Sequence, residues 1–195
     1  MTDEQVDDGR PSGLSSDDGA AIASPPKASI PDAVRVGVTG TQDGLTEAQQ
    51  EAARMVFKGL HAGGAEWQHN GDCIGADSFA AHFWHALGGK VHLHPPSYNG
   101  KRVFFAADSH SAPRPYMDRN TDIAKAGDVL VAMPKEFQEE LRSGTWATVR
   151  RARRMRKPII YVWPDGRTTV EWPAQAIEAR SGETPQEHGS RPLSA

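Results

Sequence analysis

The stretch DVLVAMPKEFQEELRSGTWATVRRARRMRKPIIYVWP (residues 128–164) decides the fold, because it holds one complete unit of alternating structure. Residues 128–134 and 158–164 are short apolar runs, which are typical of strands buried on both faces. Residues 143–157 lie between them with the spacing of a helix, and Val149, Ala152 and Met155 fall on one arc. A strand, a helix and a strand in this order predict two parallel strands joined by a right-handed crossover.

The same alternation extends toward the N-terminus. Apolar runs and helical spacing predict strands at 33–40, 66–72 and 90–96 and helices at 45–64, 75–89 and 115–127. The expected inward face of the first helix consists of Ala48, Ala52, Met55, Val56 and Leu60. Strands that are apolar on both faces need helices on both sides, so we predict an α/β fold with an open, doubly wound sheet of about five parallel strands. Ligands of such sheets bind beyond the carboxyl ends of the strands.

The composition divides the chain into three parts. Residues 1–32 are rich in Asp, Ser, Gly and Pro and poor in large apolar side chains, which predicts a disordered acidic arm. Residues 33–166 form the folded domain, and residues 167–195 form an extension that we expect to be mostly disordered. The first 33 residues contain seven acids and two bases, a net charge of −5, whereas the whole chain carries −3, so the remainder carries +2. A basic patch on the folded part is compatible with this balance.

The overall composition excludes several classes of protein. The chain has 195 residues, 37% of them hydrophobic, which suffices for one core, and its net charge of −3 excludes a globally basic nucleic-acid binder. The single cysteine, Cys73, excludes an internal disulfide and indicates a reducing compartment. The acidic N-terminus is unlike a signal peptide, and no apolar run approaches the roughly 20 residues that span a bilayer. We therefore expect a cytoplasmic protein without a membrane partner.

A first glycine-rich turn, GVTGTQDGLT (37–46), links the first strand to the first helix. Gly40, Thr41 and Gln42 stand where backbone amides can approach a phosphate or a ribose. The turn has neither the GxGxxG pattern nor the Lys-Ser/Thr of a Walker loop, and a plain strand-to-helix turn would have the same composition. Thr46 is the expected N-cap of the helix that follows.

A second glycine-rich turn, GDCIGAD (71–77), opens the second helix. Its glycines are Gly71 and Gly75, and it carries two carboxylates, Asp72 and Asp77. Helix capping and the helix dipole explain one aspartate, and the other is a candidate for holding a ribose hydroxyl. Cys73 lies in the same turn, but no His or Asn spacing makes it a nucleophile.

The most specific element is RSGTW (142–146), at the start of the helix in the opening stretch. Ser143, Gly144 and Thr145 lie at its first turn, whose amides lack partners within the helix and attract anions. Gly144 permits close approach of a phosphate, whereas the alternative is that Ser143 acts only as an N-cap.

Arg119 and Asn120 begin the preceding helix at the same sheet edge, where a guanidinium can hold a phosphate or simply be exposed.

The histidines include two close pairs, His82/His85 on a helix and His92/His94 on a strand. No Cys, Glu or further His completes a zinc set at a spacing typical of such sites. We therefore expect structural or surface roles for these histidines, and neither a metal nor a cofactor.

Four arginines form the outer arc of the last helix: Arg150, Arg151, Arg153 and Arg154. Two interpretations of this cluster are open. It is either a solvated helix face or a basic patch for a nucleic-acid backbone.

Taken in order, these motifs resemble the SLOG superfamily, and its YspA-like branch is the best fit. The resemblance rests on GVTGTQ, GDCIGAD, HPP, RN followed by AGDVLVAMP, and SGTWATVRRAR with KPIIYVWP, and it covers residues 34–164. The superfamily includes the Smf/DprA DNA-processing proteins and the LOG nucleotide-cleaving enzymes. The resemblance implies a Rossmann-like domain that binds nucleotides or nucleotide-derived ligands.

The resemblance also implies the residues of the ligand site. They are Gly40, Thr41, Gln42, Gly71, Asp72, Gly75, Asp77, Arg119, Asn120, Ser143, Gly144 and Thr145. LOG enzymes carry Pro-Gly-Gly-x-Gly-Thr-x-x-Glu, whose glutamate assists N-glycosidic cleavage, but here Thr148 stands at that position and LRS replaces Pro-Gly-Gly. This departure argues against hydrolysis of the LOG type.

Three functions follow, in order of preference. The first is binding or sensing of a nucleotide-derived small molecule by a homo-oligomer, with phosphate on Arg119 and the 143–145 amides, ribose on Asp72 or Asp77, and the base on Gln42 or Trp146. The second is a nucleotide N-glycosidic hydrolase with Asp72 or Asp77 as its catalytic carboxylate. The third is weak, DprA-like binding of single-stranded DNA through the four arginines of the last helix.

Overall fold

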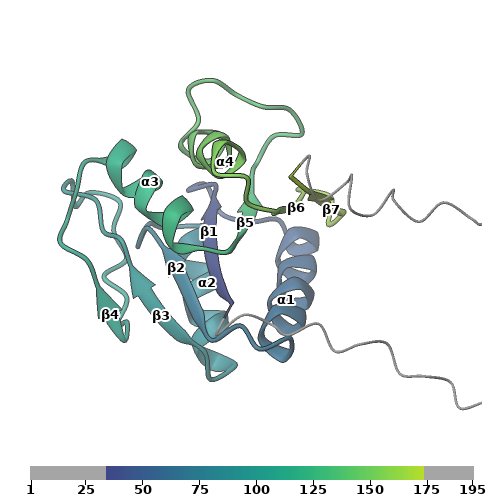
Figure 1. Ribbon diagram of the computed structural model, residues 1–195, viewed down its shortest axis with the longest axis horizontal. Coiled ribbons are helices and arrows are strands. Elements are labelled where there is room, and N and C mark those ends of the chain that lie inside the picture. Colours follow the sequence, from purple (N-terminus) through teal and green to yellow (C-terminus); the bar gives the residue numbers. More distant parts are fainter. Residues whose placement is uncertain (1–33, 174–195) are drawn as a thin grey trace, which may run out of the picture.

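A seven-stranded sheet forms the centre of the computed structural model, which describes residues 34–173 (Figure 1). The strands are β1 (Arg35–Gly40), β2 (Trp67–Asn70), β3 (Lys90–Leu93), β4 (Ser109–His110), β5 (Val129–Met133), β6 (Ile159–Val162) and β7 (Thr168–Glu171). Their order across the sheet is β4-β3-β2-β1-β5-β6-β7. Neighbouring strands are parallel except β6 and β7, which are antiparallel.

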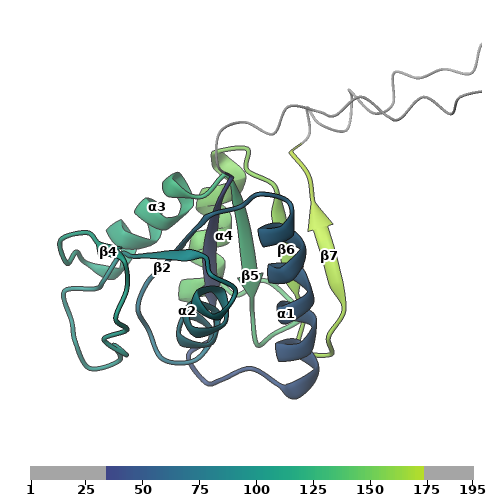
Figure 2. The same cartoon turned by 90° about the horizontal axis from the view of Figure 1, so that it is seen from below.

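Helices cover both faces of this sheet. They are α1 (Glu47–Ala62), α2 (Ala76–Ala86), α3 (Tyr116–Ala126) and α4 (Gly144–Arg154). Figure 2 shows α1 and α2 on one side and α3 and α4 on the other. Strand β5 is buried along its whole length, with Val131 and Met133 packing in the core under α1 and α2, and Leu130 in the core under α3 and α4. This two-sided burial explains why the strand is a continuous apolar run.

The predicted α/β, doubly wound fold is confirmed, and all five predicted strands are present. Two short strands were not predicted, β4 and β7, and they extend the sheet at its two edges. Strand β7 lies at the start of the predicted C-terminal extension. The remainder of that extension, from residue 174 on, and the acidic arm at 1–32 lie outside the described residues.

The predicted inward face of α1 is confirmed for Ala52, Val56 and Leu60, which pack against the core, and is wrong for Ala48 and Met55. Met55 is 60% exposed, and the fully buried residues of α1 are Gln49, Ala53 and Phe57. Gln49 belongs to this face because its Nε2 donates to the carbonyl oxygens of Pro134 and Val162, each 2.8 Å away. Burial of a polar group that keeps its hydrogen bonds costs little free energy, so Gln49 can lie on the buried face of α1.

The strand order also determines where a ligand can bind. The chain runs from β1 outward to β4 and then returns to β5 on the other side of β1. The segments that follow β1 and β5 therefore diverge, and a crevice forms beyond the carboxyl ends of these strands. Within residues 34–173, no helix combines the length and the apolarity needed to cross a membrane.

Candidate functional site

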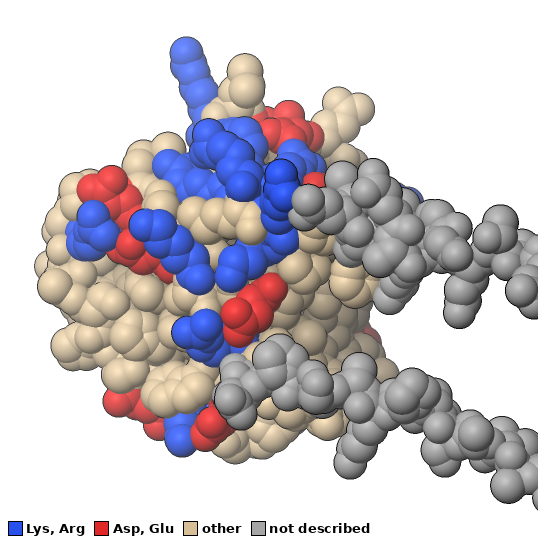
Figure 3. Space-filling model, in the orientation of Figure 1, with Lys and Arg blue, Asp and Glu red and all other residues tan. Residues whose placement is uncertain are grey.

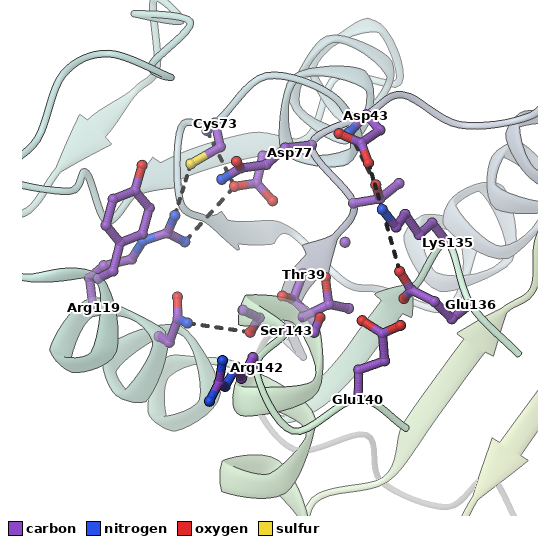
Figure 4. Close-up of a pocket in the computed structure, with 17 residues that line it drawn as sticks. Thr39, Asp43, Cys73, Asp77, Arg119, Lys135, Glu136, Glu140, Arg142 and Ser143 are labelled. Atoms are coloured by element: carbon purple, nitrogen blue, oxygen red, sulfur yellow. Dashed lines mark hydrogen bonds and ion pairs between the residues drawn. The ribbon is translucent and has the colours of Figure 1, made fainter. Parts of the chain in front are cut away.

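A cavity of about 320 Å³ lies in this crevice, in the size range of small-molecule sites (Figure 4). It is lined by the end of β1, by the segment after β5 and by the starts of α2, α3 and α4. Nine of the twelve residues expected in a ligand site line it, namely Gly40, Thr41, Gln42, Asp77, Arg119, Asn120, Ser143, Gly144 and Thr145. The structure therefore brings together residues that lie as far as 105 positions apart in the chain, from Gly40 to Thr145.

The turn after β1 is held tightly against α2. The Thr41 amide donates to Met133 O at 2.9 Å, and the Ala76 amide donates to Thr41 O at the same distance. A Cβ on Gly40 would overlap Ala76 Cβ and lie 2.8 Å from Met133 O. Gly40 therefore allows β1 and α2 to approach, and its role is in packing as well as in shaping the cavity wall.

Three of the twelve expected residues do not line the cavity: Gly71, Asp72 and Gly75. Asp72 has φ of 58° and its carboxylate accepts from Arg102 Nε at 2.8 Å and from the Phe105 amide at 3.0 Å. The side chain of Asp72 is fully buried in this contact. Its carboxylate therefore anchors the loop that follows β3, and it is not positioned for a ribose or for catalysis in the cavity.

Asp77 and Arg119 form a buried pair on one wall of the cavity. Asp77 Oδ2 accepts from the amides of Gly71 and Cys73 at 3.1 and 3.3 Å, and Arg119 Nη1 lies 3.9 Å away. Burial raises the pKa of Asp77, against the opposite effect of Arg119. A Cβ on Gly71 would overlap the Arg119 guanidinium, so this glycine makes room for the arginine.

Cys73 lies beside this pair and is not an activated nucleophile. Arg119 Nη2 donates to Cys73 Sγ at 2.9 Å, and the residue is only 2% exposed. Burial, with the charge of Asp77 adding to it, raises the pKa of the Cys73 thiol to about 11. The thiol is neutral near pH 7, so Cys73 serves as a polar lining of the cavity.

The start of α4 forms the opposite wall. Ser143 Oγ accepts from the Trp146 amide at 3.4 Å, so Ser143 is the N-cap. Gly144 follows it, and a Cβ at this position would meet no atom within 4 Å. The backbone at Gly144 therefore faces open space in the cavity, and the amides of Gly144 and Thr145, unlike that of Trp146, are left without a capping partner among the described residues. Asn120 Nδ2 donates to Gly144 O at 3.4 Å and ties α3 to this turn.

Thr148, at the position of the catalytic glutamate of LOG enzymes, lies inside the protein. It is fully buried, and its hydroxyl donates to Gly144 O at 3.1 Å within α4. It does not line the cavity. The position therefore supports the turn and has no carboxylate to offer to a substrate.

Acidic side chains occupy a third side of the cavity, from the segment after β5. Figure 4 shows Glu136 and Glu140 there, with Lys135 between Asp43 and Glu136. Lys135 Nζ lies 3.0 Å from Asp43 and 3.7 Å from Glu136. The hydrogen bond from Lys135 is the main cause of the lowered pKa of Asp43. The cavity is therefore divided into an acidic side and a side made of Arg119 and the start of α4.

The ligand-site residues expected from the sequence were of the types found in phosphate-binding turns. Other residues that line the cavity were therefore missed. These are Thr39, Asp43, Tyr116, Lys135, Glu136, Glu140 and Arg142, together with Cys73, for which the sequence suggested no binding role. Lys135 and Glu136 follow β5 just as Thr41 and Gln42 follow β1. Position beyond a strand end points to the loop after β5 as a whole, but it does not select these residues within the loop.

Lysine and arginine side chains gather over α4, as Figure 3 shows. Three of the four arginines expected to form a basic patch are engaged with other groups. Arg150 pairs with Glu139 at 2.9 Å, Arg153 pairs with both Glu139 and Glu171, and Arg151 Nε donates to Thr121 Oγ at 2.7 Å. Much of the positive charge on this helix face is therefore compensated by carboxylates of the same protein.

A third histidine, His69, lies beside His92 and His94 in the structure, although it is not at a metal-site spacing along the chain. The register of β2 and β3 places His69 opposite His92, and one ring nitrogen of each of the three histidines lies within 4.8 Å of the others. The pairing of strands produces this cluster, and spacing along the chain cannot reveal it. The cluster does not line the cavity.

At the level of sequence, no family model and no curated protein matches the chain. Solved structures do match its fold. The molybdenum cofactor binding protein from the phototrophic bacterium Rippkaea orientalis has a TM-score of 0.56 and 18% identity over 76% of this chain and 96% of that one. The molybdenum cofactor carrier protein from Chlamydomonas reinhardtii has a TM-score of 0.50 and 21% identity, over 66% and 76%.

DNA processing protein A from Streptococcus pneumoniae matches with a TM-score of 0.51 and 17% identity, over 66% of this chain and 50% of that one. At these identities the likeness shows the fold alone. The shared fold is the doubly wound α/β sheet with helices on both faces, which confirms the fold predicted from the sequence. The homo-oligomer stays a prediction.

Proposed function

We propose that the cavity binds a small molecule with a phosphate group and a nucleotide-like body. The start of α4 carries this proposal. Gly144 leaves open space where any other residue would place a Cβ, and the first-turn amides of α4 border that space. A helix N-terminus with a partial positive charge and free amides favours an anion. Arg142, which also lines the cavity, adds a full positive charge at this wall.

The other walls fit the remainder of such a ligand. Glu136 and Glu140 offer acceptors to groups that donate hydrogen bonds, such as ribose hydroxyls or the amino group of a base. A ligand with only negative charge would be repelled from this side. The division of the cavity therefore favours a molecule that is anionic at one end and a hydrogen-bond donor at the other.

Arg119 would act mainly through its charge. Its guanidinium already contacts Cys73 and Asp77, and it is 6% exposed, so two free donors for a bidentate grip are not available in this geometry. Its Nε is buried without a hydrogen-bond partner among the described residues. We infer that Arg119 contributes electrostatic attraction and one donor, while the α4 amides hold the phosphate.

Binding is favoured over N-glycosidic hydrolysis. Asp72 is directed away from the cavity, Asp77 accepts two backbone hydrogen bonds, and Thr148 replaces the glutamate of the LOG enzymes. A general acid or base must be free to exchange a proton with the substrate, and none of these residues is placed to do so. DNA binding is favoured less, because carboxylates pair with two of the arginines on α4.

A thermal-shift screen of the full chain tests the proposal. The panel contains mononucleotides, cyclic nucleotides, NAD-derived metabolites, inorganic phosphate and the molybdenum cofactor named for two of the fold neighbours. A ligand at a hundredfold excess over its Kd should add about 2.7 kcal/mol to the free energy of unfolding. Each phosphate is compared with its dephosphorylated form, and we expect stabilisation only by the phosphorylated member of a pair. Equal stabilisation by both members, or by none of the panel, would contradict the proposal.

A further inference from the structure

Three histidines meet on the sheet face that also carries α3 and α4. Val91 and Leu93 of β3 pack in the core under α1 and α2, so the alternate residues His92 and His94 point to the other face. The parallel register pairs His69 of β2 with His92. The three rings are packed closely, with centroids 4.7 to 5.4 Å apart.

The nitrogens of these rings already converge. His69 Nδ1 and His94 Nε2 are 3.1 Å apart. Two nitrogens bound to one tetrahedral ion at about 2.1 Å are separated by about 3.4 Å, so this pair is within a few tenths of an ångström of the separation that a shared metal ion requires. One nitrogen of His92 lies within 4.8 Å of both, and rotation of its ring can close the remaining gap.

Serine hydroxyls contact two of the three rings. Ser109 Oγ contacts His92 Nδ1 at 2.7 Å, so an ion on this ring would replace the Ser111 contact at Nε2. Ser111 Oγ lies 2.8 Å from His92 Nε2 and 3.4 Å from His94 Nδ1. Hydroxyls that orient metal-binding histidines in this way are typical of the second layer of a metal site.

The three rings are available as neutral ligands. His69 is 9% exposed and His94 7%. Burial lowers the pKa of His69 to about 3 and that of His94 to about 4. Neutral imidazoles are among the commonest ligands of Zn²⁺ and similar ions.

We propose that His69, His92 and His94 form a binding site for a divalent transition-metal ion of the Zn²⁺ class, separate from the cavity. Three imidazole ligands leave a fourth position, which water or the Ser111 hydroxyl can occupy. Three protein ligands with one open position are the arrangement of zinc sites that bind a further group. The site goes beyond the proposed function and does not depend on it.

The test uses the untagged full chain, stripped with a chelator and titrated with ZnCl₂ by calorimetry. The exposed pair His82 and His85 on α2 could bind Zn²⁺ on the surface, so the titration is done in the His82→Gln/His85→Gln background. We expect one Zn²⁺ per chain in that background, and His94→Gln and His92→Asn should each weaken binding by at least about tenfold. Ser109→Ala, which removes only the contact to His92 Nδ1, should weaken it by less.

X-ray absorption of the zinc complex of the unmodified chain gives a result that does not depend on the folding of a variant. We expect a first shell with three imidazole nitrogens. An absence of binding to the background protein, unchanged affinity in both His94→Gln and His92→Asn, or a shell without three imidazoles would overturn the proposal. In that case the cluster is a hydrogen-bonded network of histidines and serines.

Discussion

The glycine-rich turns that open α2 and α4 look alike in the sequence, but the protein packs closely around the first and leaves open space beside the second. The turn before α2 is closed by the protein itself. Gly75 packs against the backbone of Thr41, and Gly71 packs against Arg119. The Asp72 carboxylate accepts a hydrogen bond from Arg102. The turn before α4 is open, because a Cβ on Gly144 would meet no atom within 4 Å.

The difference separates two reasons for a glycine. In the first turn the missing side chains allow close packing of α2, and substitution there should change stability. In the second turn the missing side chain leaves space beside free helix amides, and substitution should change binding only.

The largest effect is expected for Gly75→Ala. Gly75 has φ of 79°, and its added Cβ would overlap the Thr41 carbonyl oxygen and lie 2.9 Å from Gln42 Cα. Backbone strain and overpacking each cost about 1–3 kcal/mol, so we expect a loss of about 3 kcal/mol in the free energy of unfolding, measured in urea. Gly144→Ala is the matched control and should stay within about 0.5 kcal/mol of the natural protein. Equal stability of the two variants would remove the contrast between the turns.

A smaller effect is expected for Asp72→Asn, which keeps the side-chain shape and the tolerance of positive φ. Loss of the charge weakens the buried bond to Arg102, and we expect a loss of about 1–3 kcal/mol in stability. The control is Asp128→Asn, which breaks the more exposed contact to Arg35 and should cost less than about 1 kcal/mol. Ligand affinity should be unchanged in both. Loss of ligand binding in Asp72→Asn at full stability would return Asp72 to the list of binding residues.

The smallest effect concerns the arginines of α4. Fluorescence anisotropy with a single-stranded oligonucleotide should show weak binding at physiological salt. Arg154 is exposed, and its replacement by alanine should reduce the salt slope by about 0.7 if it contacts a phosphate. Arg150→Ala should have less effect, because Glu139 already pairs with Arg150. Tight binding with a slope that falls equally in both variants would instead support a nucleic-acid interface.

Much of the fold could be predicted because it depends on local patterns. Strands that are apolar on both faces and glycines at helix ends are visible along the chain, and they gave the doubly wound sheet and the edge where ligands bind. The burial of Gln49 on α1 could not be predicted, since it depends on two carbonyl groups more than 80 positions away. Strand β7 was missed because its residues are mostly exposed and lack an apolar pattern.

The candidate site shows the same limit. Nine lining residues could be predicted, because the residue types of a turn or a helix start are visible in the local sequence. The position of the Asp72 carboxylate could not, because it depends on Arg102, which lies 30 positions further along the chain. The histidine cluster depended on strand register, which places His69 beside His92. Contacts between distant segments determine which polar residues face a cavity and which are used inside the protein, and a single sequence does not contain that information.

The most direct test of the account is the affinity of Gly144→Val for the phosphorylated ligand found in the screen, measured by calorimetry. The control is Gly59→Val on α1, where an added Cβ also meets no atom within 4 Å and which does not line the cavity. We expect both variants to keep their stability within about 0.5 kcal/mol, while only Gly144→Val loses binding. Unchanged affinity in Gly144→Val would contradict the claim that the open start of α4 is the phosphate site.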